Sequence, residues 1–163
     1  MASDAYLQID GIKGESADSK HQGWIEVTDV QFGVTQPRSA TASTAGGHTA
    51  ERAELSEVTF TKVADISSPI LFQSCAMGKT IPKAKIEFMR ADGNGEPIKY
   101  YEIELENVLI GQVRPDQGPD NMLYETVQLK YSKIKVKYTQ QKIGGGTAGN
   151  TAGGWDLAAN RPV

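Results

Sequence analysis

Residues 57–88, EVTFTKVADISSPILFQSCAMGKTIPKAKIEF, decide the fold, because they place one short helix in a chain that otherwise alternates like β-structure. Ser68 can accept a backbone N–H of the first helical turn, so we expect it to cap the helix. Pro69 suits the first helical position, where its missing N–H costs nothing. Gly78 is expected to end the helix, because glycine readily adopts the left-handed conformation of a helix end.

Both segments beside this helix have the two-residue period of strands. Apolar side chains alternate with charged or polar ones, which places them on one face of a sheet. They are Val58 and Phe60, with Lys62 on the same side, before the helix, and Ala84, Ile86 and Phe88 after it. The helix is therefore predicted to connect two strands of a mainly β domain.

The apolar pattern changes phase midway through three predicted strands, within residues 24–34, 101–110 and 127–138. In the first, apolar residues move from odd to even positions after Val27. A one-residue slip exchanges the two faces of a strand unless a bulge or bend intervenes. We therefore expect long, bent strands that pass between two sheets, as in a tight antiparallel β-barrel rather than a flat sandwich.

Turn signals separate the predicted strands. Residues 92–95, DGNG, are typical of a hairpin turn and predict pairing between residues 85–90 and 98–107. Residues 114–121 are expected to form a second loop. Residues 36–51 have no periodicity, and a loop of that length in a compact domain is usually functional or disordered.

The organisation along the chain is one domain followed by a tail. We place a β-barrel domain at residues 1–141 and a glycine-rich C-terminal tail at residues 142–163. The glycines of the tail predict a flexible segment, but Trp155 and Leu157 near its end need an apolar surface on which to dock.

Length and composition exclude several classes of protein. At 163 residues the chain is large enough to bury a core, and its single cysteine excludes an internal disulfide framework. We find no secretory signal sequence at the N-terminus and no apolar run of roughly 18 residues, so membrane insertion is not expected. A net charge of −3 makes nucleic acid a poor partner. Synthesis in the reducing cytoplasm is expected.

No motif predicts catalysis, a metal site or a cofactor site. Residues 78–80, GKT, resemble the end of a phosphate-binding loop, but that motif needs glycine where Gln73 stands and precedes its helix. His21 and His48 lie in predicted loops without ligand partners at metal-binding spacing. Cys75 lies on an apolar side of the helix and is interpreted as a small core residue. We therefore expect no enzyme activity.

Two surface features allow alternative interpretations. Ile70, Leu71 and Phe72 are consecutive and cover a wide arc of the helix, which needs either a neighbouring subunit or a loop of the same chain to cover it. Alternating charges form the second feature. They pair across strands on a solvated face, or they form complementary rims between subunits: Glu102, Glu104 and Glu106; Lys133, Lys135 and Lys137.

Several blocks of residues resemble one family, the hemolysin-coregulated proteins, or Hcp, which form the tube of bacterial type VI secretion systems. The blocks follow in order over about 140 residues, and together they are specific. They are Ile12-Lys13-Gly14-Glu15-Ser16 with Asp18 and His21; Phe60-Thr61-Lys62, Asp65, Ser68-Pro69, Leu71, Cys75 and Gly78-Lys79; Glu104-Leu105-Glu106-Asn107-Val108; Glu125, Val127, Leu129, Tyr131, Ile134, Val136 and Tyr138; and Gly154-Trp155.

The resemblance implies a fold and an assembly. The fold would be a tight antiparallel β-barrel of two sheets with one short α-helix packed alongside. Six copies would close head-to-tail into a ring, and rings would stack into a tube inside a contractile sheath, capped by a spike protein. Effector proteins would ride in the lumen. The assembled protein would be cytoplasmic, then secreted to the extracellular space or a target cell without a signal peptide.

In this frame we expect two contact surfaces between subunits or between rings. One is the helix, through Ile70 and Phe72. The other is the long loop, through Ser39, Ala40, Thr41, Gly46, Gly47 and His48. A tail-tube protein of another phage-like contractile particle, or a small-ligand-binding β-barrel, remains an alternative.

Overall fold

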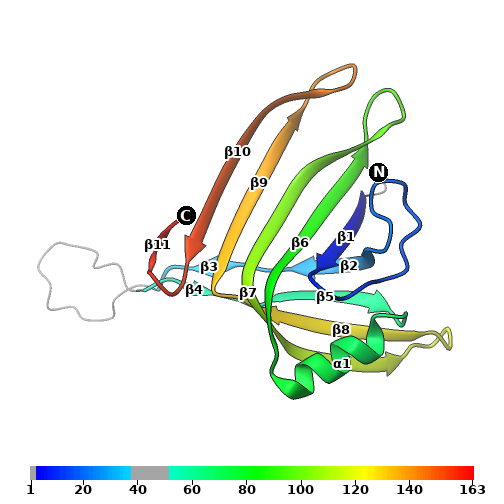
Figure 1. The fold of residues 1–163 in the computed structure, drawn as a ribbon. Coiled ribbons are helices and arrows are strands. Elements are labelled where there is room, and N and C mark those ends of the chain that lie inside the picture. The colour runs from blue at the N-terminus through cyan, green and yellow to red at the C-terminus, as the bar shows by residue number, and fades with distance from the viewer. Residues whose placement is uncertain (1–2, 38–51) are drawn as a thin grey trace, which may run out of the picture.

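A computed structural model describes residues 3–37 and 52–163, which form a nine-stranded sheet, a two-stranded sheet and one helix (Figure 1). The elements in order are β1 Ser3–Ile9, β2 Ile25–Gln31, β3 Val34–Thr35, β4 Glu54–Leu55, β5 Val58–Val63, α1 Ser68–Met77, β6 Thr80–Ala91, β7 Pro97–Gln117, β8 Leu123–Lys130, β9 Lys133–Gln141, β10 Thr147–Asp156 and β11 Arg161–Pro162.

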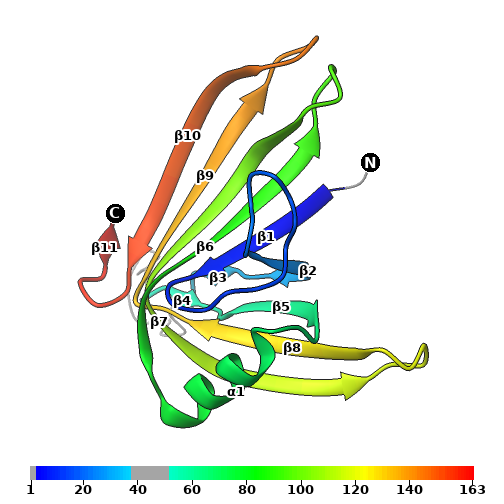
Figure 2. The same cartoon turned by 45° about the vertical axis from the view of Figure 1, so that its right-hand side comes forward.

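Six strands close into the expected antiparallel barrel. The pairing order is β7-β6-β1-β2-β5-β8, and β7 pairs again with β8 to complete the circle. Strands β9, β10 and β11 extend the sheet beyond the barrel. In Figure 2 the β6–β7 and β9–β10 hairpins rise away from the barrel, while β5 and β8 lie across its lower part. The prediction of a mainly β barrel with one helix is confirmed.

The 21-residue strand β7 belongs to both parts of the sheet. Residues 101–106 pair with β9, and residues 109–117 pair with β8. Between them Asn107 has a positive φ of 52°, which is the bend that the phase slip predicted. The slip in β2 has the same cause, because Asp29 also has φ of 52° and the β2–β5 register shifts there.

The third predicted bent strand, residues 127–138, is interrupted. Tyr131 and Ser132 separate β8 from β9, so the expectation of one continuous strand was wrong. The bend itself is present. Lys130 pairs with Leu109 and Lys133 pairs with Glu106, so β8 and β9 follow β7 in the same register on the two sides of its bend. The break lies opposite Asn107, whose side-chain amide donates a 2.9 Å hydrogen bond to the Ser132 hydroxyl. Both strands therefore turn the same corner together.

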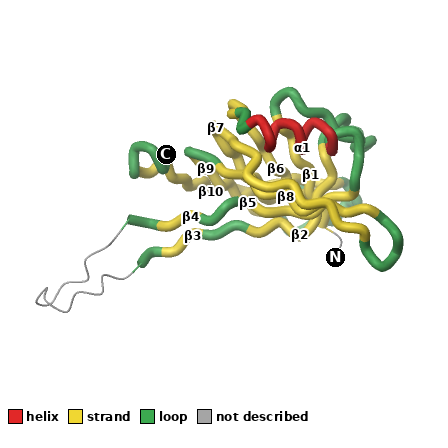
Figure 3. Tube along the Cα trace, turned by 90° about the horizontal axis from the view of Figure 1, so that it is seen from below, coloured by secondary structure: helices red, strands yellow, loops and turns green. Residues whose placement is uncertain are grey.

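The core fills the barrel and continues beneath the helix. Its fully enclosed side chains come from every barrel strand and from α1, and include Leu7, Ile25, Phe60, Leu71, Ile86, Ile103 and Leu129. Figure 3 shows α1 along one side of the sheet, with the β3–β4 hairpin projecting away from it. None of the described helices is long and apolar enough to cross a membrane.

The predicted turns hold in part. The β6–β7 hairpin is confirmed, and its turn is fixed by the Asp92 carboxylate, which accepts hydrogen bonds from the backbone N–H groups of Asn94 and Glu96. The loop expected at residues 114–121 is shorter, because β7 continues to Gln117 and stays paired with β8. Only residues 118–122 connect the two strands.

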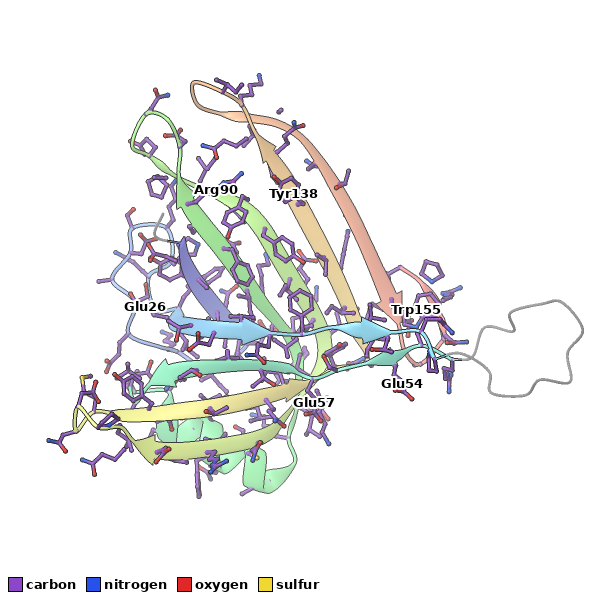
Figure 4. All side chains as sticks on the ribbon, turned by 180° about the vertical axis from the view of Figure 1, so that it is seen from behind. Glu26, Glu54, Glu57, Arg90, Tyr138 and Trp155 are labelled. Carbon is purple, nitrogen blue, oxygen red and sulfur yellow. The ribbon has the colours of Figure 1, made fainter. Side chains whose placement is uncertain are left out.

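The C-terminal residues form a strand rather than the expected flexible segment. The predicted boundary at residue 141 coincides with the end of β9, and β10 then returns beside β9 through backbone pairing. At Gly154 an added Cβ would lie 2.5 Å from the Ile134 carbonyl oxygen, so glycine is what allows the close approach. Trp155 packs against the core at the lower end of β10 (Figure 4), where it finds the expected docking surface.

Candidate assembly surface

A buried charged cluster fixes the start of the helix on the barrel. Lys62 on β5 is 2% exposed, and its ammonium lies 2.6 Å from Oε1 of Glu125 on β8. It also lies 3.0 Å from Oδ1 of Asp65 and donates a 3.1 Å hydrogen bond to the Ser68 hydroxyl. Ser68 in turn donates to Glu125 at 2.5 Å. Buried charges are tolerated when they are paired and hydrogen-bonded in this way.

The same cluster corrects the expected helix cap. Ser67, not Ser68, is the N-cap residue, and its side chain does not cap the helix. The Ser67 hydroxyl bonds to Asp65 instead, and Ser68 is held by Glu125. Gly78 ends the helix with φ of 64°, as predicted. Sequence spacing put Lys62 on the core side, but it could not reveal the partner that lies 63 positions away.

The outer face of α1 carries large apolar side chains that the described residues do not cover. Leu71 is fully buried against the barrel, whereas Ile70 is 44% and Phe72 61% exposed. Met77 at the end of the helix and Ile66, which lies just before the helix, are similarly exposed. Of the two alternatives, cover by a loop of the same chain is therefore not provided to Ile70 and Phe72 by the described ranges 3–37 and 52–163.

A groove of about 770 Å³ continues from this face. One wall is the start of the helix, with Ile66 and Ile70. The other wall is the end of β1 and the loop at residues 10–24, with Ile12 and Trp24. Exposed apolar surface lined in this way is typical of an interaction site.

A histidine holds the loop wall of the groove in place. His21 is 1% exposed, with Nδ1 2.6 Å from Asp18 Oδ2 and Nε2 2.9 Å from Glu87 Oε1 on β6. Its ring stacks on Tyr6 and meets the edge of Trp24. The hydrogen bond from His21 lowers the pKa of Asp18. Sequence analysis found no role for His21, because its second partner lies 66 positions away.

The two predicted rows of charge pair with each other inside one chain. Across β7 and β9 the register places Glu102 opposite Lys137, Glu104 opposite Lys135 and Glu106 opposite Lys133. The Lys133 ammonium lies 3.2 Å from Glu106, and Lys85 on β6 lies 3.6 Å from Glu102. The interpretation as cross-strand pairs is confirmed for the register and for the Glu106–Lys133 ion pair, but Glu102 is buried and pairs with Lys85 and Lys99 instead.

The remaining predicted contact residues lie outside the described part of the chain: Ser39, Ala40, Thr41, Gly46, Gly47 and His48. Strands β3 and β4 flank this segment and pair with each other. Within residues 3–37 and 52–163, no group of three or more His, Cys, Asp or Glu side chains could hold a metal ion. Cys75 is half-buried and packs against the core.

Comparison with known proteins supports the same family throughout the chain. Residues 6–138 match the family described as "Type VI secretion system effector, Hcp". Protein hcp1 of Pseudomonas aeruginosa is 33% identical over 162 residues, covering 98% of each chain. The crystal structure of Hcp1 from Salmonella typhimurium is 32% identical with a TM-score of 0.79, covering 100% of each chain. A solved type six secretion system protein is 25% identical with a TM-score of 0.91, covering 99% of this chain and 100% of that chain. The barrel, its helix and these similarities together show that the chain belongs to the Hcp family of type VI secretion proteins.

Proposed function

We propose that the chain is the tube subunit of a type VI secretion system, with six copies in a head-to-tail ring and rings stacked into a tube. The observation that carries the proposal is the uncovered apolar face of α1, which runs into the groove beside it. Among residues 3–37 and 52–163, no segment covers Phe72, Ile70 or Ile66, and a neighbouring subunit would remove the free-energy cost of this exposed apolar surface.

A head-to-tail ring requires two different surfaces on each subunit, and each surface contacts the other kind of surface on a neighbouring subunit. The helix face and groove supply one. The β6–β7 and β9–β10 hairpins project on another side, and Ile143 at the β9–β10 tip is fully exposed. These unlike surfaces favour a heterologous, closing contact over a two-fold dimer.

The rest of the mechanism follows from that assembly. The tube would form in the cytoplasm inside a contractile sheath, with a spike protein at its tip, and contraction would expel it. Effector proteins would be carried in the lumen by binding rather than by chemistry. The buried Lys62 ammonium pairs with the buried Glu125 carboxylate and the half-buried Asp65 carboxylate, which supports a structural role for the cluster.

Native mass tests the proposal most directly. Size-exclusion chromatography with light scattering should give about six times the 17.6 kDa mass of one chain, and negative-stain images of that peak should show rings with an open centre. A monomer that does not associate as its concentration rises would contradict the proposal.

The segment at residues 39–48 is proposed as a second contact between subunits or rings. Its length and lack of periodicity motivate the proposal. Deletion of residues 40–47 should weaken ring formation or stacking while the barrel stays folded. Unchanged rings and unchanged stacking would remove the segment from the assembly surface.

A further inference from the structure

His21 lies between two carboxylates that belong to different parts of the fold. Asp18 is on its own loop, and Glu87 is on β6. A neutral imidazole carries only one N–H, so one of its nitrogens would point a lone pair at a carboxylate oxygen. Both short contacts are hydrogen bonds only when both ring nitrogens are protonated. The two contacts, at 2.6 Å and 2.9 Å, therefore make the docking of the ring depend on whether it carries one proton or two.

We propose that His21 is a protonation-controlled clamp that docks the loop at residues 10–24 on β6 and thereby sets the shape of the groove. With the proton present, the ring makes two charge-assisted hydrogen bonds, which are stronger than neutral ones. When solvent removes one proton, one of the two contacts becomes repulsive. Deprotonation then frees the loop from Asp18 or from β6, and the groove wall moves with it.

Both carboxylates also bond to groups other than the ring. On β7 the Lys99 ammonium lies 3.4 Å from Glu87 and also bonds to Glu102. On the loop, the Lys20 backbone N–H donates to Asp18 at 3.2 Å. The ring stacks on Tyr6 of β1, whose pKa is raised first by burial and then by the nearby charges of Asp18, Asp4 and Glu26. The ring therefore sits among carboxylates from its own loop and from β6.

The loop transmits the change because it is internally tied. Gly14 N–H donates to the Gly23 carbonyl at 2.8 Å, and Ser16 N–H donates to the Trp24 carbonyl at 2.9 Å. An added Cβ at Gly14 would lie 2.5 Å from the Trp24 carbonyl oxygen, so the two arms of the loop are in close contact. Trp24 lines the groove and touches the His21 ring edge-on, with centroids 4.7 Å apart. Displacement of His21 therefore displaces the groove wall.

The regulation of assembly that this implies rests on the proposed function, but the clamp itself is a property of one chain. The clamp can be measured whether the protein is a hexamer or a monomer. If the protein forms a hexameric ring but residues 10–24 do not respond to deprotonation of His21, the clamp alone is overturned. A monomer with a responsive loop would overturn the proposed assembly alone.

Two measurements on the full chain test the clamp between pH 5 and 9, a range that spans the usual charge change of histidine. Imidazole NMR with ¹³C-labelled histidine follows two signals, and His48→Gln identifies that of His21. Hydrogen–deuterium exchange follows the backbone amides of residues 10–24, corrected for the intrinsic effect of pH. Exchange in the loop should rise about tenfold as His21 deprotonates, the order expected for one lost charge-assisted hydrogen bond. The strands should not change in step.

Glu87→Gln is the matched variant. A glutamine amide can accept from the charged ring through its oxygen or donate to the neutral ring through its nitrogen. The loop should therefore stay protected across the His21 titration in this variant. Loop exchange that ignores His21 deprotonation in the parent protein, or the same tenfold rise in the Glu87→Gln variant, would overturn the clamp.

Discussion

At the scale of residues, Lys62 is the least expected member of the core. A lone ammonium in an apolar interior would cost several kcal/mol, but here it donates hydrogen bonds to Glu125 and Ser68 and forms an ion pair with Asp65. Two of these partners lie at the start of α1, and the third lies on β8. The contacts of Lys62 therefore do more than neutralise its charge, because they fix where the helix begins on the barrel.

Removal of this ammonium should be costly. Lys62→Met leaves the buried Glu125 carboxylate and the half-buried Asp65 carboxylate without their cation, so the free energy of unfolding should fall by about 3 kcal/mol in urea titrations. Lys62→Met with Glu125→Leu should recover part of the loss. Lys85→Met, which removes a more exposed lysine paired with Glu102, should cost less than about 1 kcal/mol. Equal losses for the two single variants would contradict the role of Lys62.

Asp18 should contribute to acid sensitivity. Its pKa is lowered below 3.8, first of all by the hydrogen bond from His21. A carboxyl with a lowered folded-state pKa stabilises the fold fully above its unfolded pKa, and this contribution is lost as the pH falls through the folded-state value. The difference in free energy of unfolding between the parent protein and Asp18→Asn should therefore become smaller below about pH 3.8, as measured by thermal unfolding. A difference that stays constant down to about pH 2.5 would contradict this assignment.

At the scale of elements, β10 shows how backbone pairing alone can form a strand. Its residues are mostly threonine, alanine, asparagine and glycine, and most of their side chains are exposed. The strand forms because β9 offers an open edge and because Gly154 permits close approach to Ile134. Trp155 then fixes the far end of the strand on the core.

Neighbouring glycines in β10 should respond differently to alanine. Gly154→Ala places a Cβ against the Ile134 carbonyl oxygen, so it should destabilise the β9–β10 pairing by roughly 1–3 kcal/mol. Gly153→Ala meets no atom within 4 Å and should be nearly neutral. Hydrogen–deuterium exchange of residues 147–156 measures both. Equal protection of the β10 backbone amides from exchange in the two variants would contradict the prediction.

At the scale of the whole molecule, adjacent helix residues separate folding from assembly. Phe72→Asp changes an exposed side chain, so the chain should stay folded while its native mass falls from a ring toward a monomer. Leu71→Asp puts a charge into the core and should unfold the chain. Circular dichroism and light scattering on the same samples distinguish these outcomes. An unfolded Phe72→Asp variant would assign Phe72 to the core of the subunit.

Much of this molecule could be predicted from local patterns, and the remainder depended on contacts distant in the sequence. The slip after Leu105 predicted the bend at Asn107, because apolar periodicity records which face is buried. Strand β10 could not be predicted in this way, because its glycine and alanine residues do not form a two-residue alternation of apolar and polar side chains. The His21–Glu87 contact was equally hidden, because no spacing rule links a loop residue to a strand 66 positions away.

Strand β7 has a mechanical consequence for the subunit. Because one unbroken strand runs through both the barrel and the projecting sheet, the two cannot be peeled apart at a linker. A force that pulls the hairpin tips away from the barrel is shared by the backbone hydrogen bonds that β7 makes with β6, β8 and β9. The barrel and the projecting sheet should therefore respond to load together rather than as two separate bodies. Large movements within any assembly would then take place between subunits.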